Sequence, residues 1–304
     1  MQYELRNGVC IPAIFMGTYP LKNELMDTAV DAALASGYRG FDTARNYLNE
    51  DSLGNSLQKF LPKYGLGRKD VFITTKIGED LVNGVPDGKT LTAAYPGEHK
   101  DIRALVERYL ADSFTKLHTD YIDLLLIHWP HPDYFVELWR AFEAVYRAEK
   151  VKAIGVSNCR EWHLRKLLDE GAEFVPMVNQ IEHHPFNSQR GVIESCRQLG
   201  IQVQSYSPLI VGGHSRNEFP PILLQIAEKH RKSVAQVVLR WNVQQGIIPL
   251  PKSGNPERLR ENIAIFDFEL EADEMTAIDI LNEDCIYLEC ERYCPGFGRF
   301  KTNQ

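Results

Sequence analysis

Residues 13–24 read AIFMGTYPLKNE. The first four residues form a short apolar run that predicts a buried strand, and the turn after it carries a single glycine, Gly17. An open, doubly wound α/β sheet usually shows the pattern Gly-x-Gly-x-x-Gly directly after its first strand. Because this turn lacks that pattern, the segment favours a closed barrel over an open sheet.

Similar runs recur along the chain, and stretches with helical periodicity alternate with them. After residues 13–16, the predicted strands cover residues 38–42, 71–76, 121–128, 151–157, 176–182, 201–207 and 246–251. The predicted helices cover residues 24–38, 50–60, 101–117, 134–150, 161–170, 190–199, 222–243 and 271–281. Eight strands that alternate with helices predict an α/β fold of the (β/α)8 or TIM-barrel type, built as one domain over residues 1–304.

Three segments lie outside this alternation. Asn7-Gly8 stands between two short strand-like runs, which predicts an N-terminal hairpin with a type I′ turn. Residues 77–101 are rich in glycine, proline and acidic residues, and we expect this long segment to be an active-site loop. Residues 282–304 predict an irregular C-terminal tail.

Composition limits the class of partner. The chain has 304 residues and a formal net charge of −7, so a basic surface for nucleic acid or an anionic membrane is not expected. The first residues lack the features of a signal peptide, no apolar run approaches the roughly 20 residues that span a bilayer, and the six cysteines include no Cys-x-x-Cys pair. We expect a cytoplasmic protein that acts on a small molecule, as a monomer or weak homo-oligomer.

Polar residues stand at the ends of three consecutive predicted strands. Asp42 closes the second strand, and Tyr47 lies in the loop after it. Lys76 closes the third strand and His128 closes the fourth. All strand C-termini of a parallel barrel open on one face, so these four side chains should meet there. Each one alone is explained as well by a structural role, but the combination indicates an active site.

The combination suits proton transfer to a carbonyl oxygen. A phenol with a pKa near 10 is a poor proton donor near neutral pH. Lowering such a pKa by about three units costs about 4 kcal/mol, and one ammonium at about 4 Å supplies roughly that much at an effective dielectric constant of about 20. Lys76, held by Asp42, would supply the ammonium. Tyr47 is then a candidate general acid for carbonyl reduction, or general base for alcohol oxidation, and His128 would bind the substrate oxygen.

Seven motifs, in order and at compatible spacing, make the chain resemble the aldo-keto reductases over nearly its whole length. They are GFDTARNYLNE, ITTK, DYIDLLLIHWP, IGVSN, VNQIEHHP, SYSPL and LPKSGNPERLREN. The resemblance implies a barrel with the hairpin at its bottom, and it implies the catalytic roles argued above for Asp42, Tyr47, Lys76 and His128. It also implies a nicotinamide dinucleotide as hydride carrier, because no side chain donates hydride.

The resemblance also implies how the cofactor is held. The carboxamide would be bound by Ser157, Asn158 and Gln180, the nicotinamide ring would stack on Tyr206, and the pyrophosphate would lie at Ser207 and Leu209. The 2′-phosphate would be bound by Lys252, Ser253 and Arg258, and the adenine side by Glu261 and Asn262, while Gly17 and Thr18 belong to the same binding set. A local cationic cluster in an acidic chain favours NADP(H) over NAD(H).

Structural alternatives to these cofactor roles exist. Ser157 and Asn158 could cap the following helix, and the cationic segment could be a solvated helix start. The substrate pocket is expected at Trp129 and at Tyr19, where the family often has tryptophan.

No metal site is expected. His183 and His184 are adjacent, so on a strand their side chains point to opposite faces and cannot easily bind one ion. Three tail cysteines, Cys285, Cys290 and Cys294, lack common zinc spacing.

The favoured function is NADPH-dependent reduction of an aldehyde, a ketone or an open-chain sugar. One alternative is a nucleotide-sensing binding protein or accessory subunit on the same barrel, and another is a metal-dependent barrel hydrolase.

Overall fold

The computed structural model describes residues 1–78, 101–210, 219–288, 290–294 and 296–299. The strands are β1 (Gln2–Glu4), β2 (Cys10–Pro12), β3 (Met16–Gly17), β4 (Gly40–Asp42), β5 (Phe72–Ile77), β6 (Leu124–Ile127), β7 (Ile154–Ser157), β8 (Val178–Glu182), β9 (Gln202–Tyr206) and β10 (Ile248–Leu250). The α-helices are α1 (Asn23–Ala35), α2 (Glu50–Phe60), α3 (Ile102–Leu117), α4 (Phe135–Arg147), α5 (Glu161–Asp169), α6 (Arg190–Gln198), α7 (Pro221–His230), α8 (Val234–Gln244), α9 (Pro256–Ile263), α10 (Ala272–Asp279) and α11 (Cys290–Tyr293).

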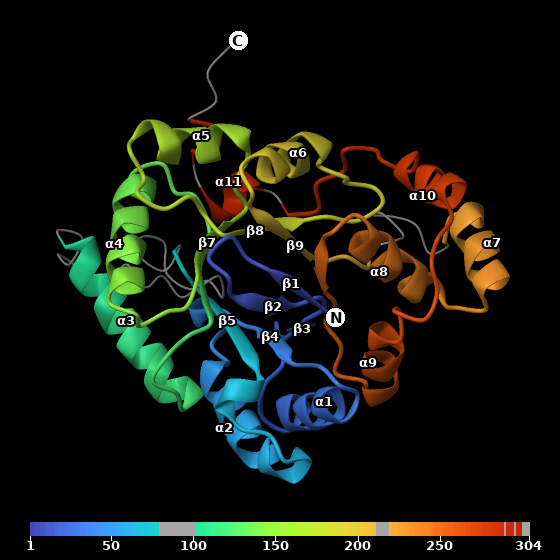
Figure 1. Ribbon diagram of the computed structural model, residues 1–304, viewed down its shortest axis with the longest axis horizontal. Coiled ribbons are helices and arrows are strands. Elements are labelled where there is room, and N and C mark those ends of the chain that lie inside the picture. Colours follow the sequence, from blue (N-terminus) through green and yellow to red (C-terminus); the bar gives the residue numbers. More distant parts are fainter. Residues whose placement is uncertain (79–100, 211–218, 289, 295, 300–304) are drawn as a thin grey trace.

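The strands from β3 to β10 form one parallel sheet in chain order, and the helices surround it (Figure 1). The first and last strands of this sheet meet. Phe15 N donates to Pro249 O at 3.1 Å, and Gly17 N donates to Pro251 O at 3.0 Å. A Cβ on Gly17 would lie 3.2 Å from the Leu250 carbonyl oxygen, so the seam favours a residue without a side chain. The predicted (β/α)8 barrel is confirmed.

The core explains why the sequence adopts this layered barrel. The β4, β5, β6, β7, β8 and β10 strands are buried along their whole length, as expected of parallel strands covered on both faces. Each outer helix turns an apolar stripe toward them. In α4, for example, Leu138, Phe142 and Val145 recur at helical spacing and are at most 2% exposed.

The N-terminal hairpin is present, but its predicted turn type is wrong. Gly8 N donates to Leu5 O at 2.8 Å, and Leu5 N donates to Val9 O at 2.9 Å. A type I′ turn would need a positive φ at Asn7, whereas the positive φ, +82°, falls on Gly8. The loop therefore has three residues, and Gly8 supplies the left-handed conformation of a bulge. Asn7 Nδ2 donates to Lys152 O at 2.9 Å, which places the hairpin where strands enter the barrel.

The stretch 222–243, predicted as one helix, is two helices. The α7 helix ends at His230, and Arg231 has a left-handed φ of 53°. The α8 helix then begins after Ser233, whose hydroxyl accepts from Gln236 N at 3.2 Å while Gln236 Oε1 accepts from Ser233 N at 3.0 Å. This reciprocal cap starts a new helix, and its Ser-x-x-Gln pattern was present in the sequence.

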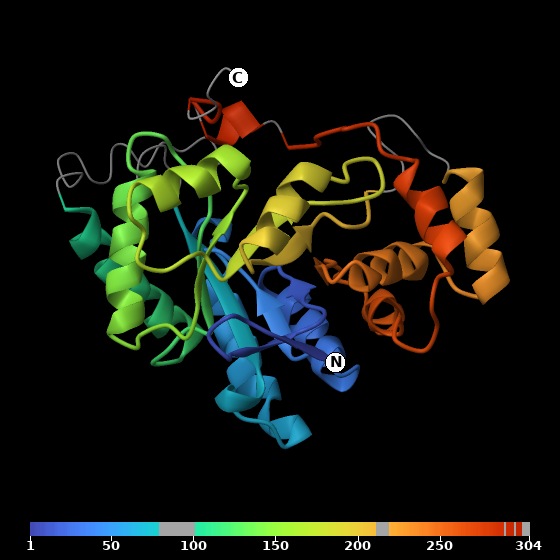
Figure 2. The ribbon, with the colours of Figure 1, turned by 45° about the horizontal axis from the view of Figure 1, so that its top comes forward.

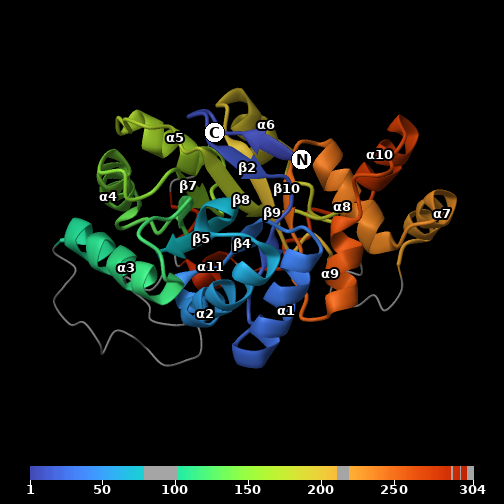
Figure 3. The same ribbon diagram turned by 60° about the horizontal axis from the view of Figure 1, so that its bottom comes forward.

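The C-terminal segment crosses the end of the barrel opposite the hairpin. Figure 2 and Figure 3 both place α11 and the hairpin on opposite sides of the sheet. The tail was expected to be irregular, yet it contains the short helix α11. Most of the expected long loop 77–101 lies outside the described residues. Within the described part of the chain, no helix is long and apolar enough to cross a membrane.

Candidate active site

A buried ion pair occupies the mouth of the barrel between β4 and β5. Lys76 Nζ donates to Asp42 Oδ1 at 2.6 Å and to the Thr43 carbonyl oxygen at 2.8 Å. The same nitrogen lies 3.4 Å from the Tyr47 hydroxyl oxygen. Lys76 is 1% exposed and Asp42 is 4% exposed. Burial of an ammonium needs such partners, and two strong acceptors hold it toward the phenol.

Tyr47 lies in the short 3-10 helix Arg45–Tyr47 directly after β4, and its ring is surrounded by the other expected groups. The His128 ring lies 5.7 Å from the Tyr47 ring, edge to face at 74°. The Tyr19 ring lies 5.0 Å from Tyr47 on the outer side and is 58% exposed. The four side chains that the sequence placed at separate strand ends therefore meet at one site.

Asn49 braces the loop that carries Tyr47. It is fully buried, and its Nδ2 donates to Thr18 O at 3.1 Å and to Leu21 O at 3.0 Å. Its Oδ1 accepts from Thr43 Oγ1 at 2.8 Å. Thr18 in turn donates twice, by N and Oγ1, to the Asp42 carbonyl oxygen. One amide thus ties the β3–α1 loop to the β4 loop, which fixes the backbone on both sides of Asp42.

A polar network lines the next three strand ends. Ser157 Oγ donates to Gln180 O at 2.7 Å, and Asn158 Nδ2 donates to His128 O at 2.9 Å. Tyr206 Oη donates to Asn158 Oδ1 at 2.7 Å. Arg160, and neither Ser157 nor Asn158, is the N-cap of α5. The helix-capping alternative for these two residues is therefore wrong.

Gln180 links this network to the ion pair. Its Nε2 donates to Asp42 Oδ2 at 2.8 Å and to Gln204 Oε1 at 3.0 Å. Asp42 therefore accepts from Lys76 with one oxygen and from Gln180 with the other. Sequence reasoning missed Gln204, which is fully buried in β9. The signal was a polar residue inside a predicted buried strand.

The predicted phosphate-binding segment lies around the start of α9. Asn255 caps this helix, because its Oδ1 accepts from Glu257 N at 2.8 Å and Arg258 N at 3.1 Å. The side chains of Lys252 and Arg258 are exposed, and neither forms an ion pair with a described carboxylate. Ser253 is 7% exposed, and its hydroxyl accepts from Asn255 N at 3.0 Å.

The remaining predicted residues occupy different surroundings. Ser207 follows Tyr206 with a left-handed φ of 51°, and Leu209 is half-buried nearby. Asn262 is 3% exposed in α9, and Glu261 beside it is half-buried. Trp129 is 3% exposed, because the tail residue Tyr293 stacks on it at 5.5 Å.

The sequence model of the aldo/keto reductase family matches residues 13–283. The chain belongs to the aldo/keto reductase family. It is therefore an NAD(P)H-dependent oxidoreductase, as the sequence predicted.

Relatives in this family support the assignment. The chain is 41% identical over 282 residues to glyoxal reductase of Bacillus subtilis (strain 168), with 92% of each protein covered. It is 36% identical over 282 residues to methylglyoxal reductase of Escherichia coli (strain K12), which covers 92% of this chain and 93% of the relative. A Bombyx mori aldo-keto reductase solved in complex with NADP is 30% identical, with a TM-score of 0.82 and 98% of each chain covered.

A buried carboxylate that the sequence did not single out holds the tail of this reductase. Glu182, at the end of β8, accepts from Tyr287 N at 2.7 Å and from Leu288 N at 2.9 Å. Its Oε1 also lies 3.1 Å from His184 Nε2. Burial raises the pKa of Glu182, but these hydrogen bonds outweigh burial and leave it below the usual value. Only the tertiary structure brings the tail to this strand end.

The two adjacent histidines serve separate partners. His183 Nδ1 lies 2.9 Å from Asn242 Oδ1, and its ring stacks on Trp241 at 4.7 Å. His184 faces Glu182 instead. Across the residues that the structure describes, no three His, Cys, Asp or Glu side chains gather as a metal site would require.

Proposed function

We propose that this aldo-keto reductase reduces an aldehyde or ketone to the alcohol, with NADPH as hydride donor and Tyr47 as proton donor. The observation that carries the proposal is the buried Lys76 ammonium, 3.4 Å from the Tyr47 hydroxyl and held there by Asp42. A charge in this position stabilises the phenolate that forms as the proton leaves.

Bound NADPH would supply hydride to the carbonyl carbon. The protein's residues act on the oxygen. The Tyr47 hydroxyl gives its proton to the carbonyl oxygen while the Lys76 ammonium offsets the developing negative charge. His128, whose ring stands edge to face with Tyr47, donates a hydrogen bond that orients the same oxygen. Solvent then returns the proton to Tyr47, so that one hydride and one proton are added in each turnover.

The residues present fit this cofactor. Gln180 donates with its Nε2, and no described residue donates to its Oε1, which leaves an acceptor for a carboxamide N–H. Lys252 and Arg258 are exposed cations without a described carboxylate partner, as a site for a 2′-phosphate would need. NADP bound to the Bombyx mori relative supports the same choice. Ser157, Asn158 and Tyr206 would bind the nicotinamide end.

The relatives suggest which substrates to test first. Two of these relatives are named for the reduction of glyoxal and of methylglyoxal. Both compounds carry an aldehyde next to a second carbonyl. Tyr19 precedes Tyr47 in the chain, and Trp129 follows His128 directly. Both side chains are proposed to contact the substrate. We therefore expect reactive short aldehydes to be reduced.

The direct test follows NADPH absorbance with glyoxal, methylglyoxal and a nitrobenzaldehyde. The Tyr47→Phe variant should lower kcat by about 10²- to 10⁴-fold while NADPH affinity is kept, because only the proton donor is lost. Tyr64→Phe is a matched control, since this hydroxyl bonds Asp31 away from the site. NADPH binding without consumption would favour the nucleotide-sensing alternative, and full activity of Tyr47→Phe would contradict the proton-donor assignment.

A further inference from the structure

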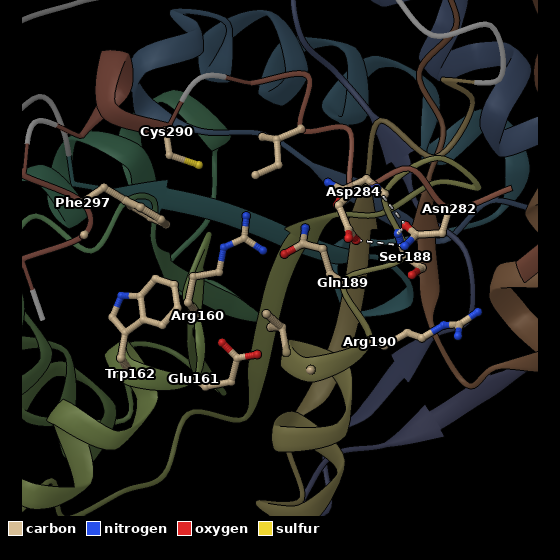
Figure 4. A pocket seen from close by; sticks show the side chains of 15 residues that line it. Arg160, Glu161, Trp162, Ser188, Gln189, Arg190, Asn282, Asp284, Cys290 and Phe297 are labelled. Atoms are coloured by element: carbon tan, nitrogen blue, oxygen red, sulfur yellow. Dashed lines mark hydrogen bonds between the residues drawn. The ribbon is translucent and has the colours of Figure 1, made fainter. Parts of the chain in front are cut away.

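A cavity of about 1010 Å³ opens between the first turns of α5 and α6 and the tail, as Figure 4 shows. Its walls include none of Asp42, Tyr47, Lys76 or His128. The cavity is therefore separate from the catalytic ion pair, and nothing in the proposed reduction uses it.

Two charged side chains at the start of α5 face this cavity. The Arg160 guanidinium lies beside the Cys290 thiol and forms no ion pair with a described carboxylate. The Glu161 carboxylate has no ion-pair or hydrogen-bond partner among the described residues either. Its Oε1 lies against the first turn of α6, only 2.5 Å from where a Cβ on Gly191 would be. Two opposite charges thus line one cavity without pairing with each other.

Gln189 adds a buried acceptor. It is 9% exposed, and its Nε2 donates to the Glu182 carbonyl oxygen. Because a carbonyl oxygen can only accept, the amide orientation is fixed and Oε1 is left on the other side. This Oε1 receives no hydrogen bond. Figure 4 shows the amide directed toward the Arg160 side of the cavity.

Ser188 is the second buried polar group without a partner for its side chain. The residue is 3% exposed, and its Oγ makes no hydrogen bond. Its backbone N donates to Asn282 Oδ1 at 2.8 Å, which fixes its position against the tail. A buried amide oxygen without a partner, such as Gln189 Oε1, costs stability unless a ligand or a water molecule binds it.

Apolar side chains also line the cavity. Trp162 comes from α5 beside the two charged residues, Ile286 and Phe297 come from the tail, and Phe297 is 7% exposed. His163 Nε2 lies 2.9 Å from the Phe297 carbonyl oxygen and holds this part of the tail against α5. The cavity therefore combines a cation, an anion, a buried acceptor and an aromatic surface.

We propose that this cavity binds a small α-amino or α-hydroxy carboxylic acid with an apolar side chain. The carboxylate pairs with the Arg160 guanidinium, whose planar fork suits it. The α-ammonium or α-hydroxyl donates to Gln189 Oε1. The apolar side chain packs on Trp162 and Phe297. This site does not depend on the proposed reductase function.

Calorimetric titration of the full chain with four probes tests the ligand class. L-Phenylalanine and 3-phenyllactate carry both the carboxylate and the α donor, and both should bind. 3-Phenylpropionate lacks the α donor and should bind at least about tenfold more weakly, and phenethylamine lacks the carboxylate and should not bind. Equal affinity for phenylalanine and 3-phenylpropionate would overturn the role of Gln189. No binding of any probe at millimolar concentration would overturn the site.

Variants locate the binding. Arg160→Met should weaken phenylalanine by about tenfold or more, whereas Arg165→Met on an exposed part of the same helix should leave its affinity unchanged. Equal effects of the two variants would contradict the proposal. A measurement on the unmodified chain is independent of whether Arg160→Met folds. The indole N–H signal of Trp162 should shift on titration while that of the buried Trp241 does not, and an unshifted Trp162 would also overturn the site.

Discussion

The geometry around Lys76 decides what the residues of this reductase can do. At 3.4 Å and an effective dielectric constant of about 20, one ammonium stabilises a phenolate by about 5 kcal/mol, which covers the roughly 4 kcal/mol needed to lower a phenol pKa by about three units. Asp42 keeps Lys76 in place and is itself held by Gln180. The proposed proton transfer would therefore depend on three fixed side chains, Gln180, Asp42 and Lys76, that stand behind the Tyr47 phenol.

The clearest further prediction for a single residue concerns cofactor choice. Arg258→Ala should weaken NADPH by about tenfold and leave NADH nearly unchanged, because the two cofactors differ only in the 2′-phosphate. Fluorescence titration with both cofactors measures this. Arg260→Ala on the same helix is the control, and equal losses for NADPH and NADH in Arg258→Ala would remove the phosphate site from this segment.

Among the elements, the strands fix the site and the tail packs on Trp129 beside it. Lys76 lies in β5 and His128 follows β6 directly, so their Cα positions are set by the barrel. The tail depends on fewer contacts. Glu182 holds Tyr287 and Leu288 by their backbone, and stacking of Tyr293 on Trp129 continues the attachment. The tail should therefore be the first of these segments to detach.

Glu182→Gln tests this attachment. A glutamine can accept from only one of the two backbone N–H groups, so tail docking should lose about 1–3 kcal/mol. Limited proteolysis should cut residues 283–299 faster in this variant, with hydrogen exchange rising at Tyr287 and Leu288. Glu194→Gln, on the exposed face of α6, should behave like the unmodified chain. Unchanged protection in Glu182→Gln would show that the tail is held elsewhere.

Across the whole molecule, buried histidines tie distant segments together and make its stability depend on pH. His163 and His183 are both fully buried, and burial lowers the pKa of each from 6.5 to about 4. Between these values the unfolded chain binds protons at both imidazoles while the folded chain does not. The free energy of unfolding therefore falls as the pH drops from about 6.5 to 4, by roughly 3 kcal/mol for each imidazole.

Urea titrations at pH 7.5, 6 and 5 measure this loss. The slope of unfolding free energy against pH gives the number of protons taken up on unfolding. In His163→Gln this number should fall by about one in this window, because one imidazole no longer titrates. His118→Gln, which replaces an exposed histidine, is the matched control variant. The interpretation fails if His163→Gln keeps the full slope.

Local sequence patterns predicted much of the fold and brought together the candidate catalytic residues. Strand runs, their alternation with helices and the missing Gly-x-Gly-x-x-Gly turn predicted the barrel, and strand-end positions predicted that Asp42, Tyr47, Lys76 and His128 meet. These predictions depend on short-range periodicity and on the rule that all strand C-termini of a parallel barrel open on one face. The sequence after Arg231 contains the Ser-x-x-Gln pattern of a helix start, which the prediction of one long helix over residues 222–243 did not use. The I′ turn failed because the same Asn-Gly pair also fits a three-residue loop.

Only the tertiary structure decided the contacts between segments far apart in the chain. Nothing in the sequence near Glu182 indicates that it accepts from Leu288, 106 positions later, or that Asn49 braces the loop of Thr18. Likewise, Arg160, Gln189 and Phe297 share a cavity only because the tail returns over α5 and α6. Periodicity specifies which face of an element is buried, whereas the partner of a buried polar group is set by the packing of the complete chain.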